Sequence, residues 1–159
     1  MNRRKILMWA CLGLAVGFWL CVASEPALAQ VRDELRPLQH WRGIYSDARM
    51  PARLVIKDPR TWAEIWRLTS NEDPPRIDFR RFMVIACFMG QRPTGGYAVE
   101  ITGVYYDRSL DRIIVQVTQF VPGPGAIVPQ VITSPYHMVL VPRLDKPVHF
   151  QVRTINTQH

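Results

Sequence analysis

The chain has 159 residues, of which 48% are hydrophobic, and its 20 Lys and Arg against 13 Asp and Glu give a net charge of +7. After the first five residues the basic side chains are scattered, and Arg80-Arg81 is the only adjacent pair. Nucleic-acid-binding proteins concentrate basic charge on one face or interleave it with aromatic residues. The composition therefore argues against a nucleic-acid partner and favours a soluble surface that attracts acidic partners.

The N-terminal segment has the pattern of a secretory signal peptide. Its first five residues carry three cations, residues 6–23 are almost wholly apolar, and the Ala-Leu-Ala at 27–29 has the spacing that signal peptidase cleaves. We predict a signal peptide over residues 1–29, cut after Ala29, and hence a periplasmic or extracellular protein. An uncleaved membrane anchor is the alternative, because this apolar stretch approaches the length that spans a bilayer; only then is the membrane a partner.

The rest of the chain is short enough for one domain. Residues 30–40 are polar and predict a flexible arm, so we place a single β-rich domain at 41–159. Two of the three cysteines would leave with the signal peptide, and Cys87 alone could form no intramolecular disulfide.

Residues 44–58 predict two short extended segments split by a turn near 47–51. A helix then begins after Asp58, which is a good N-cap, with Pro59 at the first helical position. Its bulky residues share one face, which predicts core packing rather than a ligand platform. These residues are Trp62, Ile65, Trp66 and Thr69.

From residue 82 onward the pattern predicts strand after strand. Residues 82–89 form a continuous apolar run, as in a strand covered on both faces. Residues 97–102 alternate with a period of two, and Gly103 then breaks the phase as a β-bulge would. Further strands are expected at 113–118, 137–142 and 148–153. The fold class is α+β: a largely antiparallel β-sheet of five or more strands with one early amphipathic helix packed on it.

Two glycine-containing loops are the candidate binding surface. Gly95-Gly96 leads into a strand rather than a helix, which excludes a phosphate-binding loop and predicts a hairpin turn or bulge. The turn could also present side chains to a partner, and the Pro/Gly-rich loop at 121–130 could serve as a lid, a spacer or a bare connection. The candidate partner-binding residues are Arg92, Thr94, Gly95, Gly96, Tyr97, Pro122, Gly123, Pro124 and Gly125.

The sequence contains no recognisable arrangement of catalytic residues. Cys87 lies in the most apolar run, where cysteine behaves as a small hydrophobic residue. His149 is expected on a solvated strand face, and the pairing of His137 is left open. No metal-ligand spacing and no serine nucleophile motif occur. We expect no enzyme activity, no cofactor and no metal.

Several segments in a fixed order resemble the PrcB C-terminal domain family. They are DPRTWAEIWRL, IDF, FMVIACFMGQRPTGGYAVEI and VPGPGAIVPQVITSPYHMVLVP, within residues 58–142. The hallmark of that family resembles a Gly followed by Thr-Gly-Gly-Tyr, and further on a Pro/Gly loop and a Thr-x-Pro segment. In this sequence the corresponding positions are Gly90, 94–97, 122–129 and 133–135. The family is named after a subunit associated with a secreted bacterial protease complex. The resemblance implies a small, non-catalytic β-rich module and supplies no catalytic residues.

Together these features predict an exported, non-enzymatic protein-interaction module that associates with or stabilises a protease complex. The alternative is a periplasmic protein that binds a small ligand or an envelope glycan. That alternative would use exposed aromatic side chains such as Trp41, Tyr105 or Tyr136.

Overall fold

The structure is a computed structural model that describes residues 32–157. The predicted signal peptide and its cleavage site lie outside the described residues. Within 32–157, no helix is both long enough and apolar enough to cross a bilayer.

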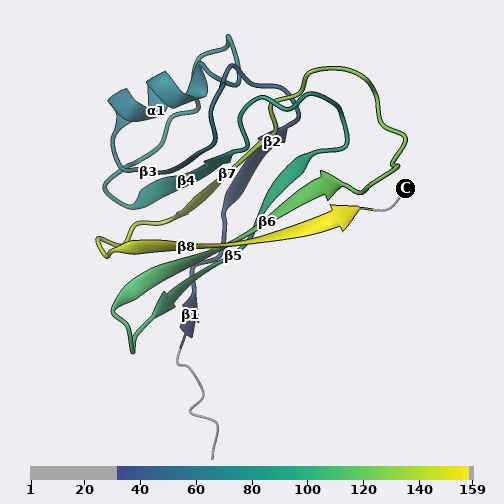
Figure 1. Ribbon diagram of the computed structural model, residues 1–159. Coiled ribbons are helices and arrows are strands. Elements are labelled where there is room, and N and C mark those ends of the chain that lie inside the picture. Colours follow the sequence, from purple (N-terminus) through teal and green to yellow (C-terminus); the bar gives the residue numbers. More distant parts are fainter. Residues whose placement is uncertain (1–31, 158–159) are drawn as a thin grey trace, which may run out of the picture.

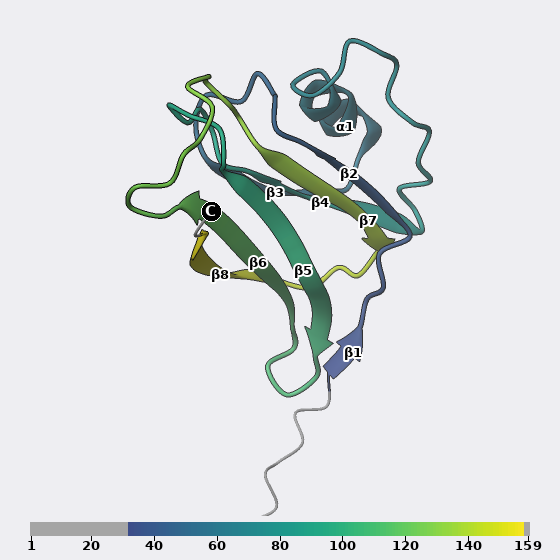
Figure 2. The same ribbon diagram turned by 90° about the vertical axis from the view of Figure 1, so that its right-hand side faces the viewer.

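Two four-stranded β-sheets and one short helix make up the fold of residues 32–157 (Figures 1 and 2). The first sheet has the order β1-β5-β6-β8 and the second β2-β7-β4-β3. Their elements are β1 (Arg32–Glu34), β2 (Gln39–Gly43), β3 (Ala52–Ile56), α1 (Pro59–Trp66), β4 (Phe82–Phe88), β5 (Ala98–Asp107), β6 (Arg112–Pro122), β7 (Tyr136–Pro142) and β8 (Val148–Thr157). All neighbours are antiparallel except β6 and β8, which are parallel. The predicted α+β class is confirmed, although the strands form two sheets.

The position of β4 between two cores explains its continuous apolar sequence. Met83, Ile85 and Cys87 point into the main core between the two sheets, while Val84 and Ala86 point into a second core beneath α1. Both faces of the strand are therefore covered, as predicted. Burial in this strand also raises the pKa of the Cys87 thiol to about 12.

The helix begins as its sequence predicts. Asp58 accepts a hydrogen bond of 2.9 Å from the Thr61 N–H and caps the helix. Trp62 and Trp66 are buried and lie 5.2 Å apart between ring centroids, with Trp41 of β2 packed against both. Their indole N–H groups donate to backbone carbonyls, so the polar edges of both rings are satisfied. The prediction that these tryptophans pack in the core is confirmed.

The start of the domain differs from the prediction. Instead of a loose arm over 30–40, Arg32–Glu34 pairs with β5, and β2 begins at Gln39. The Arg32 Nε bonds at 3.3 Å to Asp107, whose side chain is fully buried. This polar strand is held by backbone pairing and by that ion pair, neither of which hydrophobic periodicity can reveal.

The predicted hairpin at 90–97 is wrong, because β4 and β5 belong to different sheets. Both edges of β4 are occupied, by β3 and β7, and the chain crosses to the other sheet instead of turning back. The predicted bulge is confirmed by the shift of register between Ile101 and Gly103.

Candidate functional site

Three connections meet at one end of the two sheets, and we call them together the loop end. They are residues 44–51 between β2 and β3, 89–97 between β4 and β5, and 123–135 between β6 and β7. Figure 2 shows them side by side at the upper left. The two loops selected from the sequence therefore share one surface, and the structure adds 44–51 as a third.

Backbone hydrogen bonds join residues 89–97 to residues 123–135. Arg92 and Thr133 exchange two bonds, of 2.7 and 3.0 Å, and the Gly95 N–H donates to the Pro129 carbonyl at 2.8 Å. The buried Thr133 hydroxyl also donates to the Thr94 carbonyl at 2.8 Å. These connections therefore form one hydrogen-bonded unit.

Gly95 and Gly96 allow the two loops to approach closely. A Cβ on Gly95 would lie 3.1 Å from the Pro129 ring, and a Cβ on Gly96 would lie 2.8 Å from Val128 and 2.9 Å from Pro122. Gly96 also has a φ of +83°, which side-chain-bearing residues rarely adopt. The glycine pair thus serves loop-to-loop packing.

The third loop is tied in through Ser134, which is 3% exposed. Its N–H donates to the Ile44 carbonyl at 2.9 Å, and its hydroxyl donates to the Ala48 carbonyl at 2.7 Å. The Ser46 hydroxyl lies 2.8 Å from the Ser134 hydroxyl. Residues 133–135 therefore hold all three loops together.

The loop end exposes an unusual share of apolar side chains. Ten large apolar side chains of residues 32–157 are exposed, and six of them lie on these loops: Ile44, Tyr45, Met50, Ile127, Val131 and Ile132. Ile127 is 94% exposed and Met50 is 75% exposed. Residues 123–135 also contain no charged residue. Clustered apolar exposure on a rigid frame is typical of a surface that binds another macromolecule.

Arg92 is a cation with unused hydrogen-bonding capacity in this apolar surface. Its guanidinium carbon lies 5.6 Å from the centroid of the Tyr97 ring, and its Nε atom is buried without a hydrogen-bond partner. None of the ion pairs among the described residues involves Arg92. Tyr97 itself packs against the main core, so it supports Arg92.

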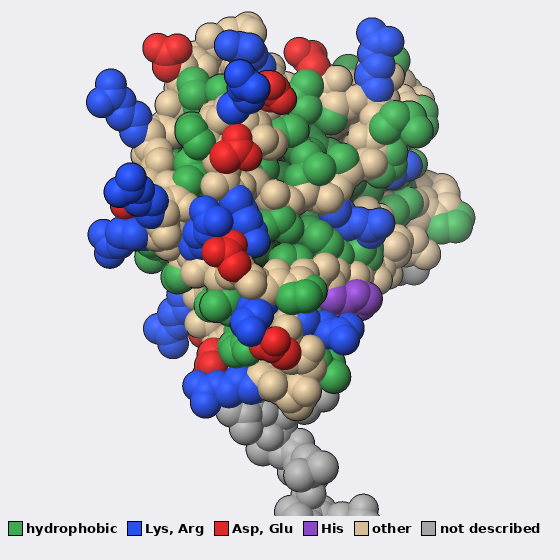
Figure 3. All heavy atoms as spheres, turned by 90° about the vertical axis from the view of Figure 1, so that its left-hand side faces the viewer, with side chains coloured by type: hydrophobic (Ala, Val, Ile, Leu, Met, Phe, Trp, Pro, Cys, Tyr) green, Lys and Arg blue, Asp and Glu red, His purple; other side chains and the backbone are tan. Residues whose placement is uncertain are grey.

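The opposite end of the molecule has a different character (Figure 3). Basic side chains are spread over that face with acidic ones between them. The turns there carry ion pairs, including Arg143 with Asp145 at 3.1 Å and Lys146 with Asp111 at 2.8 Å. No ion pair within residues 32–157 includes a residue of the loop end.

His137, whose role the sequence left open, links the two sheets. It is 2% exposed, and its Nδ1 accepts a 2.8 Å hydrogen bond from the Ile101 N–H at the bulge. The proton must therefore be on Nε2, which lies 3.2 Å from His40 Nδ1 and donates to it. Burial, with smaller effects of the His40 and Arg42 charges, lowers the pKa of His137 to about 4.

The remaining predicted site residues lie at the border of the loop end. Pro122 is the last residue of β6, so the Pro/Gly-rich loop begins at residue 123 rather than at the predicted residue 121. Proline has no backbone N–H to donate, and this is tolerated here because the pairing of β6 with β5 ends at Phe120, before Pro122. Gly123 donates to the Thr157 carbonyl at 2.9 Å, and Gly125 has open space around it. Pro124 lies between them in the 123–135 loop.

Sequence reasoning missed residues 44–51, whose beginning had been assigned to a strand. An available signal was the presence of the apolar Ile44, Tyr45 and Met50 in a segment that also contains the turn-forming Ser46, Asp47 and Pro51. Among the aromatic residues proposed for a ligand, Trp41 packs against α1 and Tyr136 stacks on Phe88. Tyr105 lies over Gly103 instead.

These features define a small two-sheet α+β module with an apolar, three-loop end. In the described part of the chain, no group of three His, Cys, Asp or Glu side chains is placed to hold a metal ion. Residues 83–142 match the family described as PrcB C-terminal, so the predicted family is confirmed and this segment of the chain belongs to it. The match begins at β4 and leaves the helix outside. No curated protein and no solved structure matches the chain.

Proposed function

We propose that this chain is an exported, non-enzymatic interaction module that holds a protein partner on its loop end. The observation that supports it is the group of six exposed apolar side chains on three loops that are hydrogen-bonded to one another. A preorganised apolar surface loses little conformational entropy on binding, which favours protein association.

The expected partner surface is apolar with an acidic side chain near its centre. Arg92 supplies the cation for that carboxylate, because its guanidinium group is stacked on Tyr97 and has no ion-pair partner. A charge-assisted bond of this kind is stronger than a neutral one. From the family name we further propose that the partner is a protease or another component of a protease complex, which the module stabilises.

The test is affinity capture from the exported fraction of the native cell with the full-length chain as bait. The double variant Ile127→Ser with Ile132→Ser alters side chains that are 94% and 64% exposed, so folding should be preserved. The matched control is Val152→Ser with Ile155→Ser on β8, where the residues are 37% and 38% exposed.

We expect a protease-complex component to be retained by the wild type and the β8 variant and lost by the loop-end variant. Truncating two central contacts of an interface commonly costs several kcal/mol, enough to remove the partner during washing. If the loop-end variant retained the same partner as the wild type, the proposed surface would be wrong.

A further inference from the structure

The outward face of the first sheet carries a second, chemically different surface. A hollow of about 330 Å³ lies over β5, β6 and β8, lined by Thr102, Gln116, Val117, Gln151, Val152 and Arg153. This volume is near the lower end of the roughly 300–1,000 Å³ found for small-ligand sites. No acidic residue lines it.

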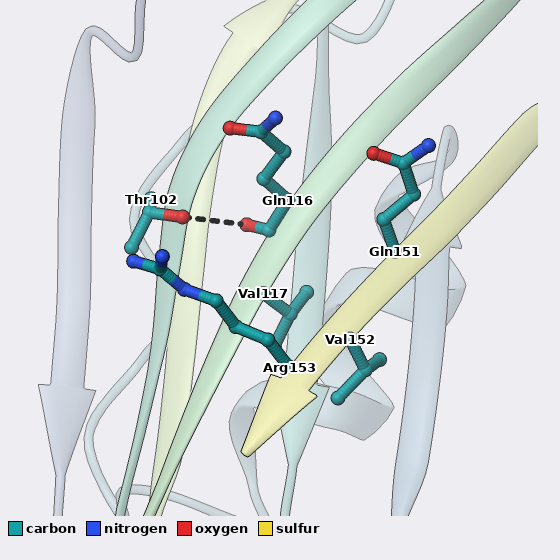
Figure 4. Close-up of a pocket in the computed structure, with 6 residues that line it drawn as sticks. All are labelled: Thr102, Gln116, Val117, Gln151, Val152 and Arg153. Atoms are coloured by element: carbon teal, nitrogen blue, oxygen red, sulfur yellow. Dashed lines mark hydrogen bonds between the residues drawn. The ribbon is translucent and has the colours of Figure 1, made fainter. Parts of the chain in front are cut away.

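Strand register places its polar groups in neighbouring rows. Gly103, Gln116 and Gln151 pair across β5, β6 and β8. Two residues further along β6 and β8, Thr118 pairs with Arg153. Figure 4 shows the side chains of Gln116 and Gln151 extending from adjacent strands to the same side. Neither side-chain amide has a hydrogen-bond partner in the described part of the chain.

Arg153 is held in position rather than extended into solvent. Its Nε donates a 2.8 Å hydrogen bond to the hydroxyl of Thr118, which is fully buried. Figure 4 shows the side chain reaching across β6 until its guanidinium group lies beside Thr102. Glu100 is in the same cross-strand row but forms no ion pair with Arg153. The terminal nitrogens are therefore available to an anionic ligand.

An aromatic ring lies on β5 beside the hollow, although it is not one of the residues that line it. Tyr105 lies over Gly103, where an added Cβ would overlap the ring. Gly103 is the β5 member of the row that contains Gln116 and Gln151. The ring thus lies over the β5 position that pairs with Gln116, and Gln151 is one strand further away on β8.

We propose that this face binds an acidic saccharide. Sugar hydroxyls both donate and accept hydrogen bonds, as do the amides of Gln116 and Gln151. A sugar carboxylate matches the planar guanidinium of Arg153 in charge and geometry. The apolar body of Tyr105 suits the C–H face of a pyranose ring. This site is independent of the protein partner proposed for the loop end.

The test titrates the full-length chain with trigalacturonate and with its methyl ester, which keeps the hydroxyls and removes the charge. Binding is followed by the NMR shifts of the Gln116 and Gln151 side-chain NH₂ groups. We expect trigalacturonate to bind about tenfold more tightly than the ester, since one charge-assisted bond contributes on the order of that factor. Arg153→Gln should remove this difference, whereas Arg112→Gln, at the start of the neighbouring strand β6 and outside the hollow, should leave it unchanged.

A second variant separates binding from folding, because Arg153→Gln also removes the bond to Thr118. Gln151→Ala leaves Arg153 and Thr118 in place and should weaken both saccharides by a similar factor. The proposal is overturned if neither saccharide shifts the two amides at up to about 10 mM. It is also overturned if the acid and its ester bind equally to the wild type, or if Gln151→Ala binds both as the wild type does.

Discussion

Lowering the pH should weaken the link between the two sheets through His137. Its Nδ1 must stay unprotonated to accept the Ile101 N–H, and its pKa is lowered from 6.5 to about 4 in the folded protein. Because the folded pKa is the lower one, the unfolded chain binds more protons between these values. The free energy of unfolding should therefore fall as the pH drops from about 6.5 to about 4.

The size of the effect follows from this pKa difference. Each unit corresponds to about 1.4 kcal/mol, so the full loss is about 3 kcal/mol and roughly 2 kcal/mol of it should occur between pH 7 and pH 4.5. Stopping at pH 4.5 limits the contribution of carboxylates such as Asp107 and Asp145, whose pKa values are lowered by hydrogen bonds with Ser109 and Arg143, respectively.

The assay is urea unfolding of the wild type, His137→Gln and His149→Gln at pH 7, 5.5 and 4.5. Glutamine can accept the Ile101 N–H without titrating, so His137→Gln should lose most of the pH dependence. His149 is exposed on β8, and its variant should behave as the wild type does. An equal decline for the wild type and His137→Gln would refute the reasoning.

Four further variants or treatments test the packing. Gly96→Val should lower the free energy of unfolding by about 1–3 kcal/mol in urea melts, because φ is positive and Val128 is close; no loss would contradict the loop packing. Trp66→Ala should cost about 3–5 kcal/mol in the same melts, and a loss under 1 kcal/mol would place the ring outside the core. Asp58→Ala should cost about 1 kcal/mol, measured by thermal unfolding, as its side chain caps α1. Native Cys87 should react with a thiol reagent only at the rate of unfolding, because its pKa is raised to about 12 and it is buried; rapid labelling would contradict this.

Local patterns predicted local structure well. The cap at Asp58, the tryptophan face of α1, the doubly covered β4 and the bulge at Gly103 all follow from residues close together in sequence. Each of these features depends on side-chain periodicity or on a short backbone preference. They could therefore be predicted without knowing which strands pair.

Pairing between distant segments could not be predicted in the same way. An apolar strand such as β4 is compatible with many neighbours, so the sequence did not reveal that it pairs with β3 and β7 rather than with β5. The partners of His137 depend on that pairing, since Ile101 belongs to the other sheet. The loop end was recognised in part, from its glycines and prolines, but its third loop is brought in by Ser134 across a long sequence separation.

The most direct test of the loop-end proposal is site-specific photocrosslinking in the native exported fraction. A photoreactive phenylalanine analogue replaces Ile127, the most exposed large apolar residue of the loop end, or Ile155 on β8 as the control. We expect a covalent adduct with a protease-complex component from position 127 and none from position 155. Adducts with the same protein from both positions, or from 155 alone, would contradict it.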